Sequence, residues 1–111
     1  MKQKFLPAIN GLKLALQDKG ILTQMILGIG VVFFGYLFKF SYVEWFVVLL
    51  AIGLVVGFEI INTCIEKICD LYSRDENPKI KVIKDLSAGS VLFSAMIAFV
   101  LFVMIVLHRV L

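Results

Sequence analysis

The chain has 111 residues, of which 61% are hydrophobic, and a formal net charge of +3. Soluble domains use roughly 45–50% apolar residues, and a chain this short has too little interior to bury such an excess. The composition therefore excludes an ordinary soluble protein and predicts an integral membrane protein with a single domain over residues 1–111.

The first segment, residues 1–19, predicts an amphipathic helix and not a membrane span. After Pro7, one side of a helix would carry Ile9, Leu12 and Leu16, and another side would carry Asn10, Lys13 and Gln17. Such a helix can lie at the membrane surface with its lysines toward headgroups or phosphates. An ordinary juxtamembrane segment fits the pattern equally well.

Three apolar segments follow, and a bilayer takes about 20 helical residues to cross. The first covers residues 21–40 and the third residues 85–108. The second apolar run, Trp45 to Phe58, is too short unless its helix continues through the polar positions that follow. We therefore expect a second span over residues 43–72 with a cytoplasmic extension, and an all-α membrane protein.

Lysine and arginine are distributed unevenly between the two sides of these spans. The first segment and the connection between the second and third spans are basic, whereas the opposite side carries only Lys39 and Arg109. Basic connections tend to stay in the cytoplasm. The N-terminus is therefore expected on the cytoplasmic side and the C-terminus outside.

Four polar residues interrupt the second span at intervals of three, four and four: Glu59, Asn62, Glu66 and Asp70. We call them the polar stripe, because at about 100° per residue they fall within an arc of roughly 80°. Carboxylates inside a membrane are costly, and they usually face a bundle interior and have a function. Glu59, expected to lie deepest, could accept a proton from a hydroxyl group. Glu66 and Asp70 suit Mg²⁺, which prefers oxygen ligands and shares them with phosphates.

Two other interpretations of the polar stripe remain open. The stripe could only join helices, with Asn62 as a hydrogen-bonding contact, although three acids exceed what such a contact needs. It could also belong to a proton or cation path. Residues 21–38 and 86–107 contain no Asp or Glu to continue such a path.

Lys84 and Asp85 stand together at the start of the third span, next to the stripe if the hairpin is tight. A lysine beside Mg²⁺-binding carboxylates is what nucleotide phosphates require, since the ammonium and the metal share their negative charge. Taken alone, Lys84 fits a positive-inside anchor, and Asp85 fits the N-cap of the third span.

The pattern E-x-x-N-x-x-x-E-x-x-x-D, followed by Lys84 and Asp85, resembles the prokaryotic diacylglycerol kinase and undecaprenol kinase family of small membrane lipid kinases. The resemblance implies a multi-pass homotrimer in the bacterial cytoplasmic (inner) membrane, with active sites between subunits at the cytoplasmic face. Further similar positions are Gly11, Leu12 and Lys13, then Glu44 and Trp45, and then Ala51, Ile52 and Gly53.

The same resemblance implies ATP- and Mg²⁺-dependent phosphorylation of a membrane lipid alcohol. The lipid would be diacylglycerol or undecaprenol, between which no motif decides, and no nucleic-acid partner is expected. Glu59 would be the catalytic base, Asn62 would orient that carboxylate or the substrate, and Glu66 would hold the metal. The residues implied to contact the nucleotide are Asp70, Lys84 and Asp85.

One position departs from the family pattern. The family usually has a second metal-binding glutamate just after the surface helix, and this chain has Lys19 there. Asp18, one residue earlier, is the candidate substitute as a metal ligand. If Asp18 does not substitute, the alternative is a catalytically impaired, non-enzymatic membrane protein of the same fold.

Overall fold

The structure, a computed structural model, describes residues 2–73, 75 and 77–111, so Met1 of the expected surface segment lies outside the described residues. Its helices are α1 (Lys2–Leu16), α2 (Lys19–Leu37), α3 (Tyr42–Tyr72) and α4 (Pro78–Val110). The last three are long and apolar enough to cross a membrane. The prediction of an all-α protein with three candidate membrane spans is thereby confirmed.

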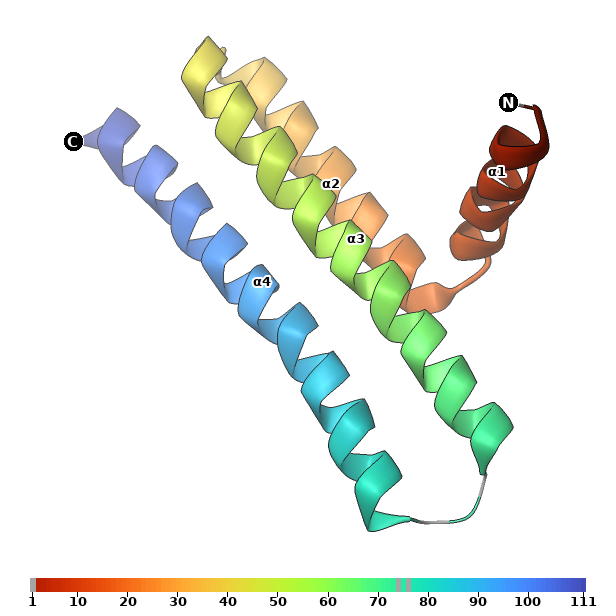
Figure 1. The fold of residues 1–111 in the computed structure, drawn as a ribbon. Coiled ribbons are helices and arrows are strands. Elements are labelled where there is room, and N and C mark those ends of the chain that lie inside the picture. Colours follow the sequence, from red (N-terminus) through yellow and green to blue (C-terminus); the bar gives the residue numbers. More distant parts are fainter. Residues whose placement is uncertain (1, 74, 76) are drawn as a thin grey trace.

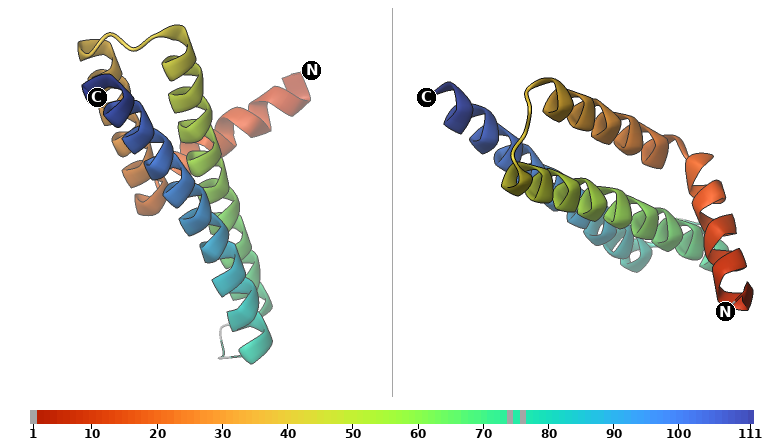
Figure 2. Two further views of the ribbon diagram at one scale, coloured as in Figure 1. Left: turned by 90° about the vertical axis from the view of Figure 1, so that its left-hand side faces the viewer. Right: turned by 90° about the horizontal axis from the view of Figure 1, so that it is seen from above.

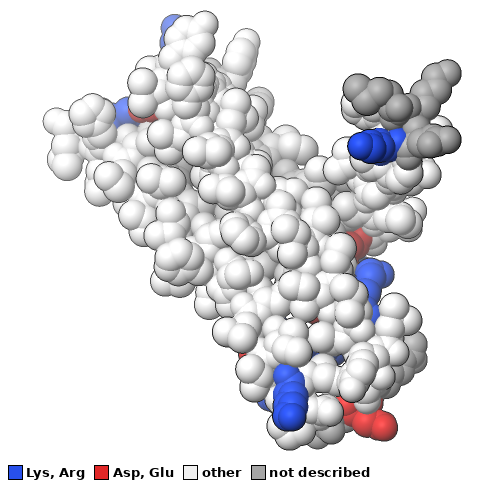
Figure 3. Space-filling model, in the orientation of Figure 1, with Lys and Arg blue, Asp and Glu red and all other residues white. Residues whose placement is uncertain are grey.

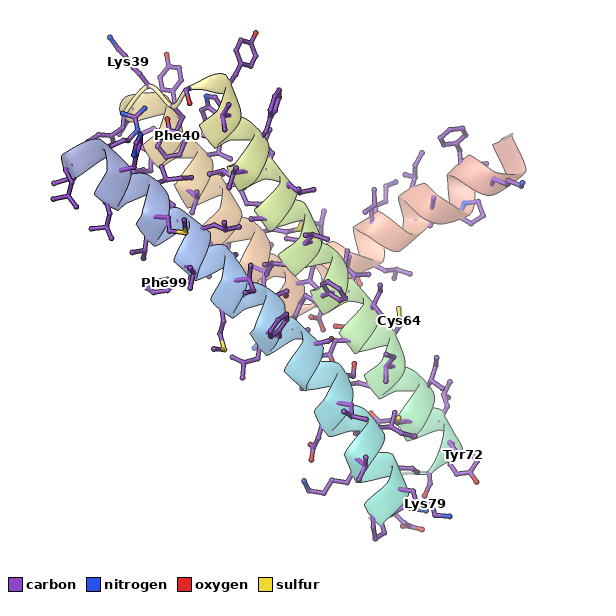
Figure 4. All side chains as sticks on the ribbon, turned by 60° about the vertical axis from the view of Figure 1, so that its left-hand side comes forward. Lys39, Phe40, Cys64, Tyr72, Lys79 and Phe99 are labelled. Carbon is purple, nitrogen blue, oxygen red and sulfur yellow. The ribbon has the colours of Figure 1, made fainter. Side chains whose placement is uncertain are left out.

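The three long helices lie side by side, and α1 leaves them at an angle (Figures 1 and 2). α3 is the central helix, because α4 packs along one side of it and α2 along another. The α2–α3 connection and the C-terminus lie at one end of the bundle. Figure 4 marks that end by Lys39 and Phe40, and the opposite end by Tyr72 and Lys79.

Each long helix begins at a side chain that caps its first turn. Asp18 caps α2, Ser41 caps α3 and Asn77 caps α4, where Pro78 takes the first helical position. The interpretation of Asp85 as the N-cap of the third span is therefore wrong. Asn77 already accepts the first backbone N–H, so α4 begins well before the apolar run and Asp85 lies inside the helix.

Buried residues recur at intervals of seven along α3, at Val48, Val55, Asn62 and Cys69. Seven-residue spacing is typical of helices that pack nearly antiparallel with a slight left-handed twist. The buried residues of α4 are Ile80, Ser87, Val91 and Ile105.

Glycines let α2 approach α3 closely. A Cβ atom at Gly28 would lie 2.9 Å from Ile52 of α3, and one at Gly35 would lie 2.9 Å from Trp45 of α3. These two glycines support the tight packing that small residues permit in membranes. A Cβ atom at Gly30, in contrast, would meet nothing within 4 Å among the described residues.

The helices differ in length, and the difference leaves one end of α3 and α4 beyond the rest of the bundle. The 19 residues of α2 make a rod of about 28 Å, close to the roughly 30 Å of a hydrocarbon core. The 31 residues of α3 extend for about 46 Å. In Figure 1 the α3–α4 hairpin projects past the start of α2, and in Figure 3 charged side chains gather at that projecting end.

Candidate functional site

Asn62 is the buried centre of the polar stripe, with 7% of its surface exposed. The hydroxyl of Ser87 on α4 donates a hydrogen bond of 2.6 Å to Asn62 Oδ1. Asn62 Nδ2 in turn donates to Oε1 of Glu66, one turn further along α3, at 2.9 Å. These two bonds join α4, Asn62 and Glu66 into one continuous chain of contacts.

Glu59 is half-buried and lies against the start of α2. A Cβ atom at Gly20 would be 2.6 Å from Glu59 Oε1 and 3.3 Å from Asp18 Oδ2. Since α2 is just long enough to cross the hydrocarbon, its first turn lies near the membrane edge. Glu59 therefore lies beside the start of α2, near the border of the apolar region.

Asp18 and Lys19 have different surroundings. Asp18 is half-buried, and its Oδ2 accepts a hydrogen bond of 3.0 Å from the backbone N–H of Ile21. Lys19 is exposed. The side chain of Asp18 therefore lies beside Glu59. Both Asp18 and Glu66 are close enough to repel the charge of the Glu59 carboxylate.

The Asp70 end of the stripe is joined to α4 by an ion pair. Lys84 Nζ lies 2.6 Å from Asp70 Oδ1, with 38% of the lysine side chain and 54% of the aspartate side chain exposed. The expected closeness of Lys84 to the stripe is present in the structure. Exposed ion pairs of this kind contribute little to stability, so the ammonium can leave Asp70 for another anion at small cost.

Asp85 follows Lys84 in the chain but points elsewhere. Its carboxylate accepts a hydrogen bond of 2.6 Å from Lys81, one turn earlier on α4, and both side chains are well exposed. Consecutive residues of a helix are about 100° apart. The structure therefore places the Lys84 side chain against the polar stripe, whereas the Asp85 side chain points away from the stripe toward Lys81.

The carboxylates of the site fit a divalent metal only in part. No group of three or more His, Cys, Asp or Glu side chains in the described part of the chain is arranged to hold one. Mg²⁺ is often held by only one or two carboxylates together with phosphate oxygens. Glu66 is exposed, and its Oε1 accepts the bond from Asn62, which leaves Oε2 for such a role. Glu66 fits a magnesium–phosphate complex, whereas Asp18 faces Glu59.

An apolar cavity of about 280 Å³ lies between α2, α3 and α4, one helical turn from Glu59. Gln24 and Val55 line its end nearest the polar stripe, and Phe102 and Ile105 line the far end. The cavity therefore runs along the spans, away from the charged end of the molecule.

Sequence reasoning missed two residues of this site, Ser87 and Gly20. In the sequence, Ser87 stands among small residues at the start of the third span, a pattern that by itself indicates only tight helix packing. The signal that could have found it is its spacing of seven from Ile80, which places a hydroxyl on the buried face of α4. Gly20 gave no sequence signal, because its role depends on which residue of α3 lies opposite.

Three apolar helices, a polar stripe on the central one and a lysine from the next define a small helical membrane protein with a polar site at one end. A family model described as prokaryotic diacylglycerol kinase matches residues 7–106, so the chain belongs to the prokaryotic diacylglycerol kinase family. It is 35% identical over 75 residues to the undecaprenol kinase of Bacillus subtilis (strain 168).

That alignment covers 68% of this chain and 61% of the relative, so the chain spans less than two thirds of the relative's length. No solved structure matches the chain. The resemblance inferred from the polar stripe is confirmed by the family match.

Proposed function

We propose that the chain is an ATP- and Mg²⁺-dependent lipid kinase, which transfers the γ-phosphoryl group of ATP to the hydroxyl of a membrane lipid alcohol. The order of groups along α3 is the observation that carries the proposal. Glu59 lies near the border of the apolar region, Glu66 lies about two turns further along α3, and the Lys84–Asp70 ion pair lies beyond it. A lipid hydroxyl can approach from the membrane side and a nucleotide from the aqueous side.

Glu59 is the proposed catalytic base. A carboxylate at the membrane border can take the proton of a lipid hydroxyl as that oxygen attacks the γ-phosphate. The apolar cavity that starts one turn away supports a long-chain alcohol as substrate, because it offers apolar surface next to the base. Diacylglycerol and undecaprenol both carry such a hydroxyl, and the relative from Bacillus subtilis is an undecaprenol kinase.

Glu66 is the proposed metal ligand, and Asn62 holds its carboxylate through the 2.9 Å hydrogen bond. Glu66 would hold Mg²⁺ together with the nucleotide, and the bound ion would supply positive charge to offset the charge that develops on phosphoryl transfer. Glu66 would contribute Oε2, while Asn62 prevents the carboxylate from rotating away. The carboxylate and amide thus position the reacting groups and carry out no covalent step.

Lys84 and Asp70 are the proposed nucleotide contacts, with Asp85 at the edge. On nucleotide binding, the Lys84 ammonium would exchange Asp70 for a phosphate oxygen. The exposure of this ion pair makes the exchange inexpensive. Asp85 is held by Lys81 and would reach only the outer part of a nucleotide.

The proposed assembly is a homotrimer in the bacterial cytoplasmic (inner) membrane, with the N-terminus in the cytoplasm and the C-terminus outside. The large exposed apolar surface of the spans and the uneven distribution of lysine and arginine support this arrangement. Native mass spectrometry from detergent checks the trimer, and protease protection of vesicles checks the orientation.

The test of the proposed chemistry is Glu59→Gln, which keeps the shape of the side chain and removes the base. We expect turnover to fall by roughly 10²–10⁴-fold, with assembly unchanged. The assay supplies labelled ATP, Mg²⁺, and diacylglycerol or undecaprenol in parallel. Turnover at the wild-type rate in Glu59→Gln rules out the base.

A second candidate, a non-enzymatic member of the family, is favoured by one observation. Lys19 occupies the expected position of a metal-binding glutamate, and no three carboxylates converge in the described residues. Binding of ATP and Mg²⁺ to the purified protein separates the two candidates. If Lys19→Glu raises lipid phosphorylation greatly above a weak wild-type rate, the natural site is impaired.

A further inference from the structure

We propose that Ser87 is a positioning residue of the site, which fixes the orientation of the Asn62 amide and through it the carboxylate of Glu66. The inference deepens the proposed kinase function and rests on it for its effect on turnover. Its structural part concerns three side chains on two helices, and it can be tested without any catalysis.

The orientation of the amide follows from the chemistry of its two neighbours. An amide side chain offers a donor, Nδ2, and an acceptor, Oδ1. The ionised carboxylate of Glu66 can only accept, so Nδ2 must face it. Oδ1 is then turned toward α4 and needs a donor, which the hydroxyl of Ser87 supplies at 2.6 Å. Only one orientation of Asn62 satisfies both neighbours.

Burial makes the donor from Ser87 necessary. Asn62 and Ser87 each have only 7% of their surface exposed, so water has little access to their contact. A buried acceptor that loses its donor carries a desolvation cost. Without the hydroxyl, Asn62 would turn toward water to satisfy Oδ1, and its bond to Glu66 would weaken.

The other serines on the same helix show that the behaviour of Ser87 is distinctive. Serine in a helix commonly donates back to a carbonyl of the preceding turn. Ser90 does so to the carbonyl of Ser87 at 2.6 Å, and Ser94 does so to the carbonyl of Val91 at 2.8 Å. The Ser87 hydroxyl instead crosses to α3. Ser94→Ala is therefore a matched control, with the same atom removed from the same helix.

The first experiment measures how fast the side-chain amide of Asn62 exchanges with water. Selective ¹⁵N labelling of asparagine gives side-chain signals from Asn10, Asn62 and Asn77, and Asn62→Ala identifies the one that disappears. We expect the Asn62 signal to be protected from exchange with water in the wild type and in Ser94→Ala. Ser87→Ala should lose that protection. Protection that persists in Ser87→Ala overturns the proposal.

A second variant, Ser87→Cys, tests the proposal if Ser87→Ala does not fold. Ser87→Cys keeps the side-chain shape and replaces a strong donor by a weak one. We expect partial loss of protection of the Asn62 amide in this variant. A Cys variant with wild-type protection contradicts the inference as clearly as an unchanged alanine variant.

The second experiment measures the Mg²⁺ dependence of lipid phosphorylation. Loss of an outer-shell partner typically costs roughly 10–100-fold in metal affinity or activity, so Ser87→Ala should raise the Mg²⁺ concentration for half-maximal turnover within that range. Ser94→Ala should leave it unchanged. In the Asn62→Ala background, Ser87→Ala should add nothing further, because its effect passes through Asn62.

The outcomes separate this inference from the proposed function. A wild-type protein without kinase activity rejects the kinase, and the exchange experiment still decides the role of Ser87. If the wild type is active and the effects of Ser87→Ala and Asn62→Ala on Mg²⁺ dependence add in full, the positioning role of Ser87 is rejected and the kinase function stands. An equal loss of stability in Ser87→Ala and Ser94→Ala, with no change in Mg²⁺ dependence, shows a merely structural serine.

Discussion

The carboxylate of Glu59 lies against the backbone of Gly20, so closely that a Cβ atom there would come within 2.6 Å of Oε1. The contact is with the end of a flexible side chain, so Gly20→Ala should displace the carboxylate and leave α2 folded. A displacement of about 1 Å can cost on the order of 10²-fold in rate. We expect a loss of turnover of that order with little change in melting temperature, measured by lipid phosphorylation and thermal unfolding.

Gly30→Ala is the control for this prediction. It introduces the same methyl group on the same helix, where nothing lies within 4 Å among the described residues. Alanine is the better helix former by roughly 1 kcal/mol, so stability should hold or rise and turnover should stay the same. Equal turnover in both alanine variants would mean that the position of Glu59 beside Gly20 has no catalytic importance.

Lys84 and Lys81 provide a second matched pair. Each holds an aspartate at 2.6 Å on the exposed end of α4, but only Lys84 holds a residue of the polar stripe. Lys84→Gln should raise the KM for ATP by about tenfold or more, since one charge-assisted phosphate contact is lost. Lys81→Gln should leave it within error. Steady-state kinetics with varied ATP checks both, and a similar rise for the two lysines would point to a general effect of charge.

Asp18 has two separable roles, as a helix cap and as a neighbour of Glu59. Asp18→Asn keeps an oxygen that can accept from Ile21 N and so preserves the cap, but it removes the negative charge. If Asp18 substitutes for the missing glutamate, this variant should need several-fold more Mg²⁺ and melt at the wild-type temperature. Asp18→Ala should also lose about 1 kcal/mol of stability with the cap. An unchanged Mg²⁺ requirement in Asp18→Asn would reduce Asp18 to a cap.

The sequence was sufficient to predict the spans and the stripe, because both depend on periodicity within one helix. A helical repeat accounts for both the apolar run and the spacing of Glu59, Asn62 and Glu66. That repeat lies within one helix and does not depend on neighbouring helices. The proximity of Lys84 to Asp70 could also be predicted, since a short connection forces the two helix ends together.

Contacts between helices were harder to predict, because the relative register of two helices leaves little trace in either one. The hydroxyl of Ser87 lies opposite Asn62, and Gly20 lies opposite Glu59, only in the packed bundle. α4 begins before the third apolar run for a local reason. Asn77 and Pro78 form a cap and a first turn in a polar segment, where no apolar period marks the helix.

Arg109 closes the opposite end of the bundle. Its guanidinium makes two hydrogen bonds to the carboxylate of Glu44, of 2.9 and 3.0 Å, and one of 2.7 Å to the carbonyl of Lys39. It also lies 5.2 Å from the centre of the Phe40 ring. One side chain near the end of α4 thus holds the α2–α3 connection and the first turn of α3.

Stability should therefore depend on the bidentate contact between the Arg109 guanidinium and Glu44, and not on the charge of Arg109 alone. Arg109→Lys keeps the charge but cannot make the bidentate contact, so its melting temperature should fall between those of the wild type and Arg109→Ala.

Glu44→Gln removes the charge of the partner while glutamine at this position can still complete the capping box with Ser41. The melting temperature of Glu44→Gln should therefore lie close to that of Arg109→Lys, and the melting temperature of Glu44→Ala should lie further from it. Turnover per folded molecule should not change in any of these variants, since the polar stripe lies at the other end of α3. A lysine variant as stable as the wild type, measured by thermal unfolding in detergent, would show that only the charge matters.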